Sequence, residues 1–331
     1  MHHTVHHHRW RVVTALAVIA VFATLGLGAS APAQAEPDID DVRKKVDKLY
    51  TQAEAANEDY SNAKLRLQDL RDQLDDLSSD EKRQSKELDK IRAELRDSVL
   101  RQFEGSDVSA VGQVITSEDP QEFLAGLSTV SSYNALQADL LARYNTEAEA
   151  LQVRREATED AKSQMAKVKS TMQQKKSEID KKYEAAQAEL DELEADELEE
   201  FQSTDTSIPS NLPPPSGRAK VAVDYALAQV GDAYVYGATG TESWDCSGLT
   251  MGAWGQAGVA LPHSSSAQYS SGPQVSRDQL APGDLVFYYS PISHVGIYIG
   301  NGMIVHASNP STGVKVSPMD EMPYTGAVRP G

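Results

Sequence analysis

The chain has 331 residues, of which 24% are charged and 6% are aromatic, so it is too long and too polar for one compact core. These values predict one globular domain joined to an elongated element. The formal net charge of −18 excludes the broad basic surface that partners such as nucleic acids require.

Residues 1–35 have the pattern of an export signal rather than of a folded element. Arg9 and Arg11 precede an apolar run over residues 12–27, and Ala33-Gln34-Ala35 is a small-x-small cleavage site. The alternative is a retained membrane anchor, although this run is shorter than the roughly 20 residues that a spanning helix needs. We therefore predict a secreted protein, either extracellular or associated with the cell wall.

The acidity is concentrated in residues 36–216, which carry a net charge of −17, whereas residues 217–331 carry −3. Proline is absent between Asp38 and Phe103, and apolar residues recur there in steps of three and four. They are Leu67, Leu70, Leu74, Leu77, Leu88, Ile91 and Leu95. This spacing predicts the heptad seam of a coiled coil. Polar residues at Glu81 and Gln84 weaken the seam locally.

A second long helix is predicted from about Ser128 to Phe201, after a helical tip around residues 105–127. Its seam is Met165, Val168, Met172, Ile179, Ala186, Leu190 and Leu193. Two such helices predict an antiparallel coiled-coil hairpin over residues 36–202, here called the arm. The alternative is that the seams pair between two molecules. The carboxylates of the arm alternate with lysine and arginine, and we interpret them as a solvated surface.

A linker and a small domain follow the arm. Pro209 and three consecutive prolines from Pro213 forbid a helix in residues 203–217 and favour extended geometry. From residue 218 to residue 331 glycines appear and the charge density falls, which predicts an α+β domain. The predicted fold is thus an all-α coiled coil before a globular α+β unit.

The single cysteine of the chain is Cys246, in the run Trp244-Asp245-Cys246-Ser247-Gly248-Leu249. Exported proteins normally pair their cysteines, so this sulfur is an inert core thiol, an intermolecular link or a nucleophile. A helix predicted over residues 249–258 places Cys246 at a helix N-terminus. Unpaired amides and the helix dipole there lower the pKa of a thiol from about 8.5 towards neutrality and can hold an oxyanion.

Histidines supply the base that a cysteine nucleophile needs. Those of the mature chain are His263, His294 and His306. The turn Gly300-Asn301-Gly302 joins two predicted strands as a hairpin, which can bring His294 and His306 side by side. Cys246 and this pair then form a Cys-His-His triad. A zinc site with the same three ligands is the chemical alternative.

Four motifs in this domain, DCSGL, PGDLVFY, HVGIYIGNG and IVHAS, resemble in order and spacing the NlpC-type family of cell-wall cysteine peptidases. The resemblance implies a papain-like fold in which Cys246 is the nucleophile, His294 the general base and His306 the residue that orients it. We expect no cofactor and no metal. Further residues are expected to contact the substrate or the oxyanion. They are Tyr234, Asp245, Ser247 and His263, the last standing where an arginine is common in the family.

The family hydrolyses the peptide stems of peptidoglycan, most often the bond from D-glutamyl to a diamino acid. A long coiled coil before such a domain also resembles wall hydrolases that a membrane complex switches on. The expected partners are therefore peptidoglycan stem peptides and a membrane-bound activator acting through the coiled coil, with no nucleic acid. The alternatives are a non-catalytic wall-binding scaffold and a papain-like amidase or acyltransferase.

Overall fold

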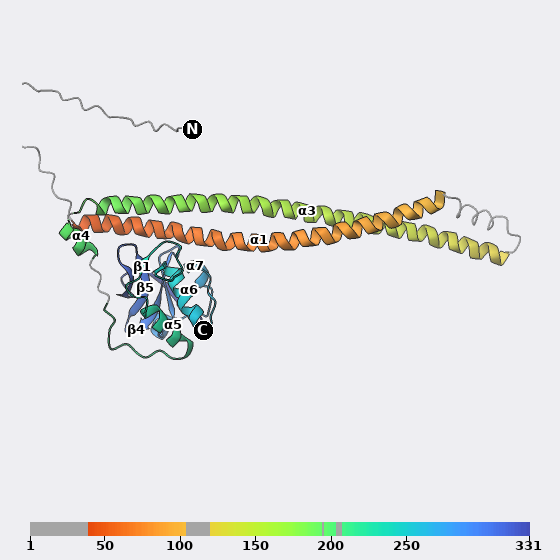
Figure 1. Cartoon of the computed structure of the whole chain (residues 1–331). Helices are drawn as coiled ribbons and strands as arrows, with labels where there is room; N and C mark the ends of the chain where they lie inside the picture. Colours follow the sequence, from red (N-terminus) through yellow and green to blue (C-terminus); the bar gives the residue numbers. More distant parts are fainter. Residues whose placement is uncertain (1–38, 104–119, 194, 203–206) are drawn as a thin grey trace, which may run out of the picture. The chain divides into compact units, whose positions relative to one another are not determined.

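The computed structural model describes residues 39–103, 120–193, 195–202 and 207–331, and Figure 1 shows their elements. The predicted export signal, most of the predicted helical tip and the start of the linker lie outside the described residues. Among the helices that are described, none is both long enough and apolar enough to cross a membrane.

Two long helices of the arm, α1 (Ile39–Phe103) and α3 (Pro120–Leu190), pack along each other (Figure 1). Their pairing is antiparallel, because hydrogen bonds between them join low residue numbers on α1 to high numbers on α3. These bonds connect Arg66 with Gln164, Gln84 with Glu147, and Ser98 with Gln137. The two predicted seams therefore meet within one chain.

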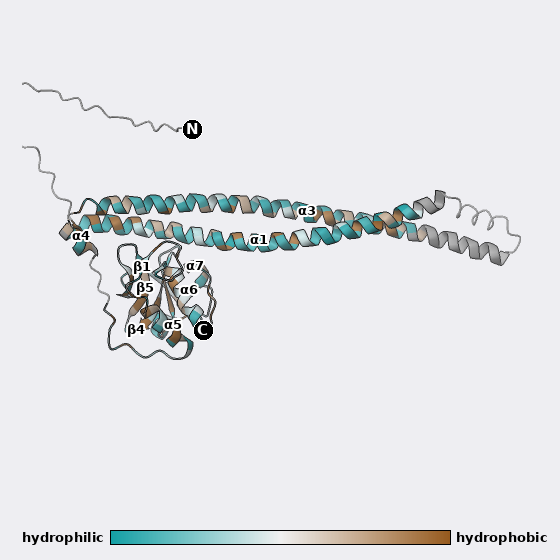
Figure 2. Ribbon diagram, viewed as in Figure 1, coloured by the Kyte–Doolittle hydropathy of each residue, from teal (hydrophilic) through white to brown (hydrophobic). Residues whose placement is uncertain are grey.

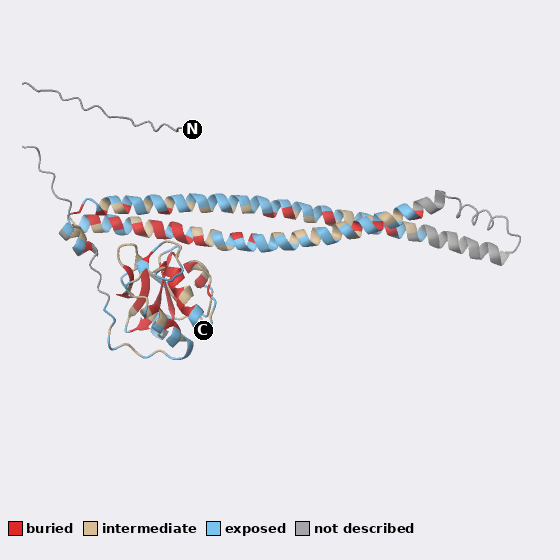
Figure 3. Cartoon of the chain, viewed as in Figure 1, coloured by how far each residue is buried: buried red, intermediate tan, exposed pale blue. Residues whose placement is uncertain are grey.

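Buried residues lie along the interface between the two helices, and the outward-facing residues are mostly hydrophilic and exposed (Figure 2, Figure 3). Ile91, for example, is 1% exposed. At the predicted weak point, Gln84 Nε2 donates a hydrogen bond to Glu147 at 2.7 Å, and Arg155 forms an ion pair with Glu81 at 3.2 Å. Polar contacts between the helices thus replace apolar packing at that position.

The second helix begins and ends earlier than predicted. It starts at Pro120 rather than near Ser128, in keeping with the preference of proline for the first turn of a helix. It ends at Leu190, and a short helix, α4 (Ala195–Gln202), follows a turn. The chain folds back after α3 because Leu193 and Phe201 complete a buried cluster of apolar side chains. The members of this cluster are Val42, Val46, Tyr50, Ala186, Leu190, Leu193 and Phe201.

The C-terminal domain combines an antiparallel sheet with short helices. Its elements are α5 (Gly217–Leu227), β1 (Ala233–Tyr234), β2 (Ser243–Trp244), α6 (Cys246–Gln256), α7 (Ser265–Gln268), a 3-10 helix (Arg277–Gln279), β3 (Leu285–Tyr288), β4 (His294–Gly300), β5 (Met303–Asn309), β6 (Gly313–Pro318) and β7 (Tyr324–Val328). The last five strands form one sheet in the order β6-β5-β4-β3-β7, and β1 pairs with β2 in parallel.

Helices α5 and α6 pack on this sheet and close the core of the domain. Leu249 and Trp254 of α6 are buried against strand residues such as Ile297 and Val305. Trp244 is also buried. A helical coiled coil followed by an α+β domain confirms the predicted fold class. The core packing fixes α6 against β4 and β5, the strands that carry the two predicted histidines.

Candidate active site

Cys246 is the first residue of α6, and Asp245 is the N-cap of that helix. Asp245 Oδ1 accepts a hydrogen bond from the Gly248 N–H at 2.6 Å, which satisfies an amide that has no partner within the helix. A glycine is needed at 248, because a Cβ there would lie 2.1 Å from the carbonyl oxygen of Ala238. The cap and the close approach hold the sulfur at the N-terminal end of α6.

His294 begins β4 and His306 lies on β5, the neighbouring strand of the hairpin. His294 Nε2 lies 2.7 Å from His306 Nδ1, and His306 Nε2 lies 3.0 Å from Ser317 Oγ. Burial, with a smaller effect of His294, lowers the pKa of His306 well below its usual range, so this ring is neutral. If the neutral ring of His306 carries its proton on Nε2, towards Ser317, its Nδ1 accepts the His294 Nε2–H. Nδ1 of His294 is then the nitrogen available for chemistry.

A glutamate of the arm, Glu54, lies next to that nitrogen. Glu54 Oε1 is 2.6 Å from His294 Nδ1, and the Tyr234 hydroxyl donates to the same oxygen at 3.4 Å. The Glu54 residue is 7% exposed, because this face of α1 lies against the domain. The prediction that the carboxylates of the arm form a solvated surface is therefore wrong for Glu54.

Glu58, one helical turn further along α1, is also buried against the domain. Its carboxylate accepts hydrogen bonds from the N–H groups of Ser265 and Ser266 at 2.8 and 2.9 Å. The hydroxyls of Ser264 and Ser266 donate to it at 2.6 and 2.7 Å. Four donors from the domain around one carboxylate form a specific contact, so the surface interpretation is wrong for Glu58 as well.

Asn57 completes this contact face of α1. Its Nδ2 donates to Asp245 Oδ2 at 3.1 Å, directly beside the predicted nucleophile. Because Glu54, Asn57 and Glu58 are three and four residues apart, they project from one side of the helix. The sequence gives only a weak signal for this contact face. The leucines of the heptad seam are absent from this part of α1, and the small side chains of Ala53 and Ala56 are buried instead.

The thiol of Cys246 is enclosed in this arrangement, with 2% of the residue exposed. Its sulfur lies 3.5 Å from Ser265 Oγ and 3.8 Å from the carbonyl oxygen of Ser293. Burial raises the pKa of the thiol well above its usual range, and the negative charges of Glu54 and Asp245 raise it further. The predicted lowering is wrong here, because desolvation and two carboxylates outweigh the helix dipole.

The other predicted contact residues gather around Asp245. His263 Nε2 lies 2.9 Å from each carboxylate oxygen of Asp245, and the Ser247 hydroxyl donates to Oδ1 at 3.3 Å. The side chain of His263 is 10% exposed, so most of its surface is covered. The roles of these side chains and of Tyr234 towards a substrate stay predictions.

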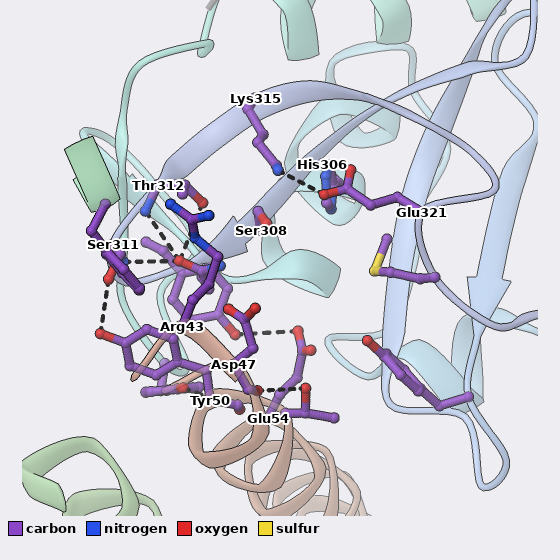
Figure 4. A pocket seen from close by; sticks show the side chains of 17 residues that line it. Arg43, Asp47, Tyr50, Glu54, His306, Ser308, Ser311, Thr312, Lys315 and Glu321 are labelled. Carbon is purple, nitrogen blue, oxygen red and sulfur yellow. Dashed lines mark hydrogen bonds and ion pairs between the residues drawn. The ribbon is translucent and has the colours of Figure 1, made fainter. Parts of the chain in front are cut away.

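A cavity of about 360 Å³ adjoins the histidine pair, with α1 on one side and the domain on the other (Figure 4). Its lining includes both Glu54 and His306. At its edge, the hydroxyls of Tyr50 and Ser311 are hydrogen-bonded at 3.0 Å. The cavity therefore places space for small solutes next to the Glu54 carboxylate while the arm is docked.

Known proteins resemble this chain in sequence. The sequence model described as the NlpC/P60 family matches residues 231–329. A probable endopeptidase of Corynebacterium glutamicum is 42% identical over 116 residues, which are 35% of this chain and 56% of that protein. A probable endopeptidase of Mycobacterium tuberculosis is 48% identical over 104 residues, which are 31% and 27%. The chain thus spans about half, or less, of the length of these relatives.

Solved structures include similar domains. The NlpC/p60 domain of the peptidoglycan hydrolase SagA is 33% identical with a TM-score of 0.32, and the match covers 33% of this chain and 97% of that one. The P60 domain of the antigen MAP1204 from M. avium subspecies paratuberculosis is 30% identical with a TM-score of 0.32, and the match covers 34% and 94%. Both matches cover about a third of this chain.

Proposed function

Because residues 231–329 belong to the NlpC/P60 family, we propose that this chain is an exported endopeptidase that hydrolyses the stem peptides of peptidoglycan. The bond we assign is the one from D-glutamyl to a diamino acid. The observation that carries the proposal is the lone thiol of Cys246 at the start of α6, beside the hydrogen-bonded pair His294 and His306. The names of the relatives, endopeptidase and peptidoglycan hydrolase, support it.

The proposed reaction is an acyl transfer through a thioester. His294 Nδ1 takes the thiol proton, and the sulfur of Cys246 attacks the stem-peptide carbonyl. The Cys246 N–H, in the first turn of α6, stabilises the oxyanion. His294 then gives its proton to the leaving amine, and water hydrolyses the thioester with His294 again as the base. His306 holds the ring of His294 so that Nδ1 faces the sulfur.

The described arrangement corresponds, in this proposal, to a resting state. Glu54 holds the nitrogen that must take the thiol proton, and Cys246 is too deeply buried for a peptide carbonyl to reach it. Since Glu58 and Asn57 hold the same face of α1 against the domain, substrate and arm exclude each other. The arm is thus an internal inhibitor of the proposed peptidase.

Activation requires this face of α1 to leave the domain. A hydrogen bond to a charged group contributes about 1.5–3 kcal/mol to stability, so breaking those of Glu54 and Glu58 costs several kcal/mol. A partner can supply that energy only if it binds the displaced arm more tightly than the docked arm. We assign this role to a membrane-bound activator outside the cell, where the export pattern of residues 1–35 would deliver the protein.

The test is digestion of purified peptidoglycan by the mature chain and by its Glu54→Ala variant, with mass spectrometry of the new termini. We expect each cleavage to leave a free α-amine on the diamino acid and a new carboxyl on D-glutamyl. We expect the variant to form these termini faster than the parent chain. A new lactyl terminus would identify an amidase instead. Absence of any new terminus from the variant, with intact binding to the wall, would indicate a non-catalytic scaffold.

A further inference from the structure

Three potential metal ligands meet where α1 contacts the domain: the carboxylate of Glu54, the sulfur of Cys246 and an imidazole nitrogen of His294. One ligand atom from each lies within 4.8 Å of the other two, and all three residues are buried. We propose that this cluster binds a divalent transition-metal ion of the Zn²⁺ class, which joins the arm to the catalytic residues. The inference deepens, and rests on, the resting state of the proposed peptidase.

Two of the three ligand atoms are already near the separation that a tetrahedral site requires. Zn²⁺ binds sulfur at about 2.3 Å and nitrogen or oxygen at about 2.0–2.2 Å, which separates tetrahedral ligand atoms by about 3.3–3.6 Å. Glu54 Oε1 and His294 Nδ1 are now 2.6 Å apart, as hydrogen-bond partners. Admitting an ion therefore requires these two atoms to separate by somewhat under 1 Å, which rotation of the Glu54 side chain on α1 can provide.

The residues behind the cluster orient its imidazole correctly for a metal. A ligating histidine usually donates its other N–H to a neighbouring acceptor, which fixes the ring. His294 Nε2 has such a neighbour in His306 Nδ1, and His306 is held in turn by Ser317. His306 is thus an outer partner and not a ligand, so the site differs from the Cys-His-His zinc site that the sequence alone allowed.

The charges of the site favour a dication. Glu54 and a deprotonated Cys246 would supply two negative charges to the ion, and Asp245 lies next to the sulfur in sequence. Binding balances as an exchange: the ion enters, and the thiol proton and the proton of the Glu54–His294 hydrogen bond leave to solvent. No oxidant or further reactant is involved. The fourth ligand position is available to water, which the cavity beside Glu54 can deliver (Figure 4).

The ligands come from two parts of the chain, so the ion would hold these two parts together. Glu54 belongs to α1, whereas Cys246 and His294 belong to the domain. Because all three ligands meet only when the arm is docked, the ion binds the resting state in preference to an open state. By linkage it then stabilises the resting state. Removal of the ion would make release of the arm easier.

The test uses the full mature chain, freed of metal by a chelator and titrated with Co²⁺, which reports thiolate ligation by a charge-transfer band in the near ultraviolet. We expect one ion per chain, a band that Zn²⁺ abolishes by displacing Co²⁺, and no band in Cys246→Ala. Glu54→Gln should weaken Co²⁺ binding by about tenfold or more, since loss of even an outer partner of a ligand costs 10–100-fold.

Two control variants separate ligation from docking. Asp59→Asn removes the same charge from α1 but lies on the face paired with Lys175 at 2.9 Å, and it should bind Co²⁺ like the parent. Glu58→Gln loosens the docked arm while keeping all three ligands, and it should weaken binding less than Glu54→Gln. An equal loss in both variants, or the absence of a thiolate band in the parent chain, would overturn the inference.

The proposed function is tested separately in the same samples. The metal-free Glu54→Gln chain should digest peptidoglycan whether or not the parent binds Co²⁺. Failure of that digestion counts against the peptidase, whereas failure of the spectroscopic test counts against the metal site alone.

Discussion

Glu54 and His294 are 240 positions apart in the chain, yet Glu54 Oε1 and His294 Nδ1 lie 2.6 Å apart in a buried contact. In the proposed mechanism, His294 Nδ1 is the base that takes the thiol proton. The contact therefore makes the arm part of the active-site environment, and it determines how the protein should respond to substitution on either side.

Glu54→Ala should activate the full mature chain. The substitution removes a charge-assisted hydrogen bond worth about 1.5–3 kcal/mol, which shifts the balance of docked and open arm by roughly tenfold or more. The measurement is the initial rate of stem-peptide release from purified peptidoglycan. Asp59→Asn, on another face of α1, is the matched control and should leave the rate unchanged. Equal rates for Glu54→Ala and the parent would show that Glu54 does not inhibit the proposed peptidase.

Cys246→Ala should abolish stem-peptide release, because no other thiol exists in the chain to form the thioester. The fold should persist, since the side chain that is lost is small and Asp245 still caps α6. Circular dichroism and mass spectrometry of the digest measure the two outcomes. The variant is best made together with Glu54→Ala, so that the parent rate is high. Cleavage that persists in the double variant would end the nucleophile assignment.

Alkylation of Cys246 should be slow in the parent chain and should rise with pH. The enclosed thiol has a raised pKa, so the reactive thiolate is scarce near neutral pH and becomes more abundant only as the pH increases. Glu54→Ala should speed the reaction with iodoacetamide at neutral pH, because it removes a negative charge and frees the arm. Rates that are fast and equal in both proteins would show that the thiol is already exposed.

His306 should act by positioning His294. His306→Ala leaves His294 Nε2 and Ser317 without their partner and should lower kcat about tenfold or more, with a smaller change in KM. His306→Asn should recover part of that loss, because its amide oxygen can accept the His294 N–H. A purely structural role predicts the opposite pattern, in which both variants lose thermal stability and activity in proportion.

Gly248→Ala should destabilise the domain by about 1–3 kcal/mol or more, as overpacking does in other cores. Its new Cβ would lie 2.1 Å from the Ala238 carbonyl oxygen, a backbone atom that cannot rotate away. Gly255→Ala in the same helix is the control, since nothing lies within 4 Å of a Cβ there. The control should be neutral or slightly stabilising in a denaturant titration. Similar midpoints for both variants would contradict the close approach.

The local pattern of residues was sufficient for much of the architecture. Heptad steps such as Leu67 to Leu70 and Leu88 to Ile91 determine which side of α1 is buried, because helical geometry repeats them on one face. The turn Gly300-Asn301-Gly302 determines the β4–β5 hairpin and so places His294 beside His306. The residues involved lie close together in sequence, so the regular geometry of a helix or a hairpin is enough to place them.

Only the tertiary structure decided what surrounds Cys246. No periodicity distinguishes Glu54 and Glu58 from the solvated glutamates of the arm, since their burial depends on how one face of α1 meets the Ser264–Ser266 turn. The same docking reverses the expected effect on the thiol, because desolvation and nearby carboxylates oppose the helix dipole. The sequence alone therefore predicted the cysteine and the two histidines as candidate catalytic residues, and it predicted the two long helices. The contact that restrains them depends on packing between distant segments, which local patterns do not encode.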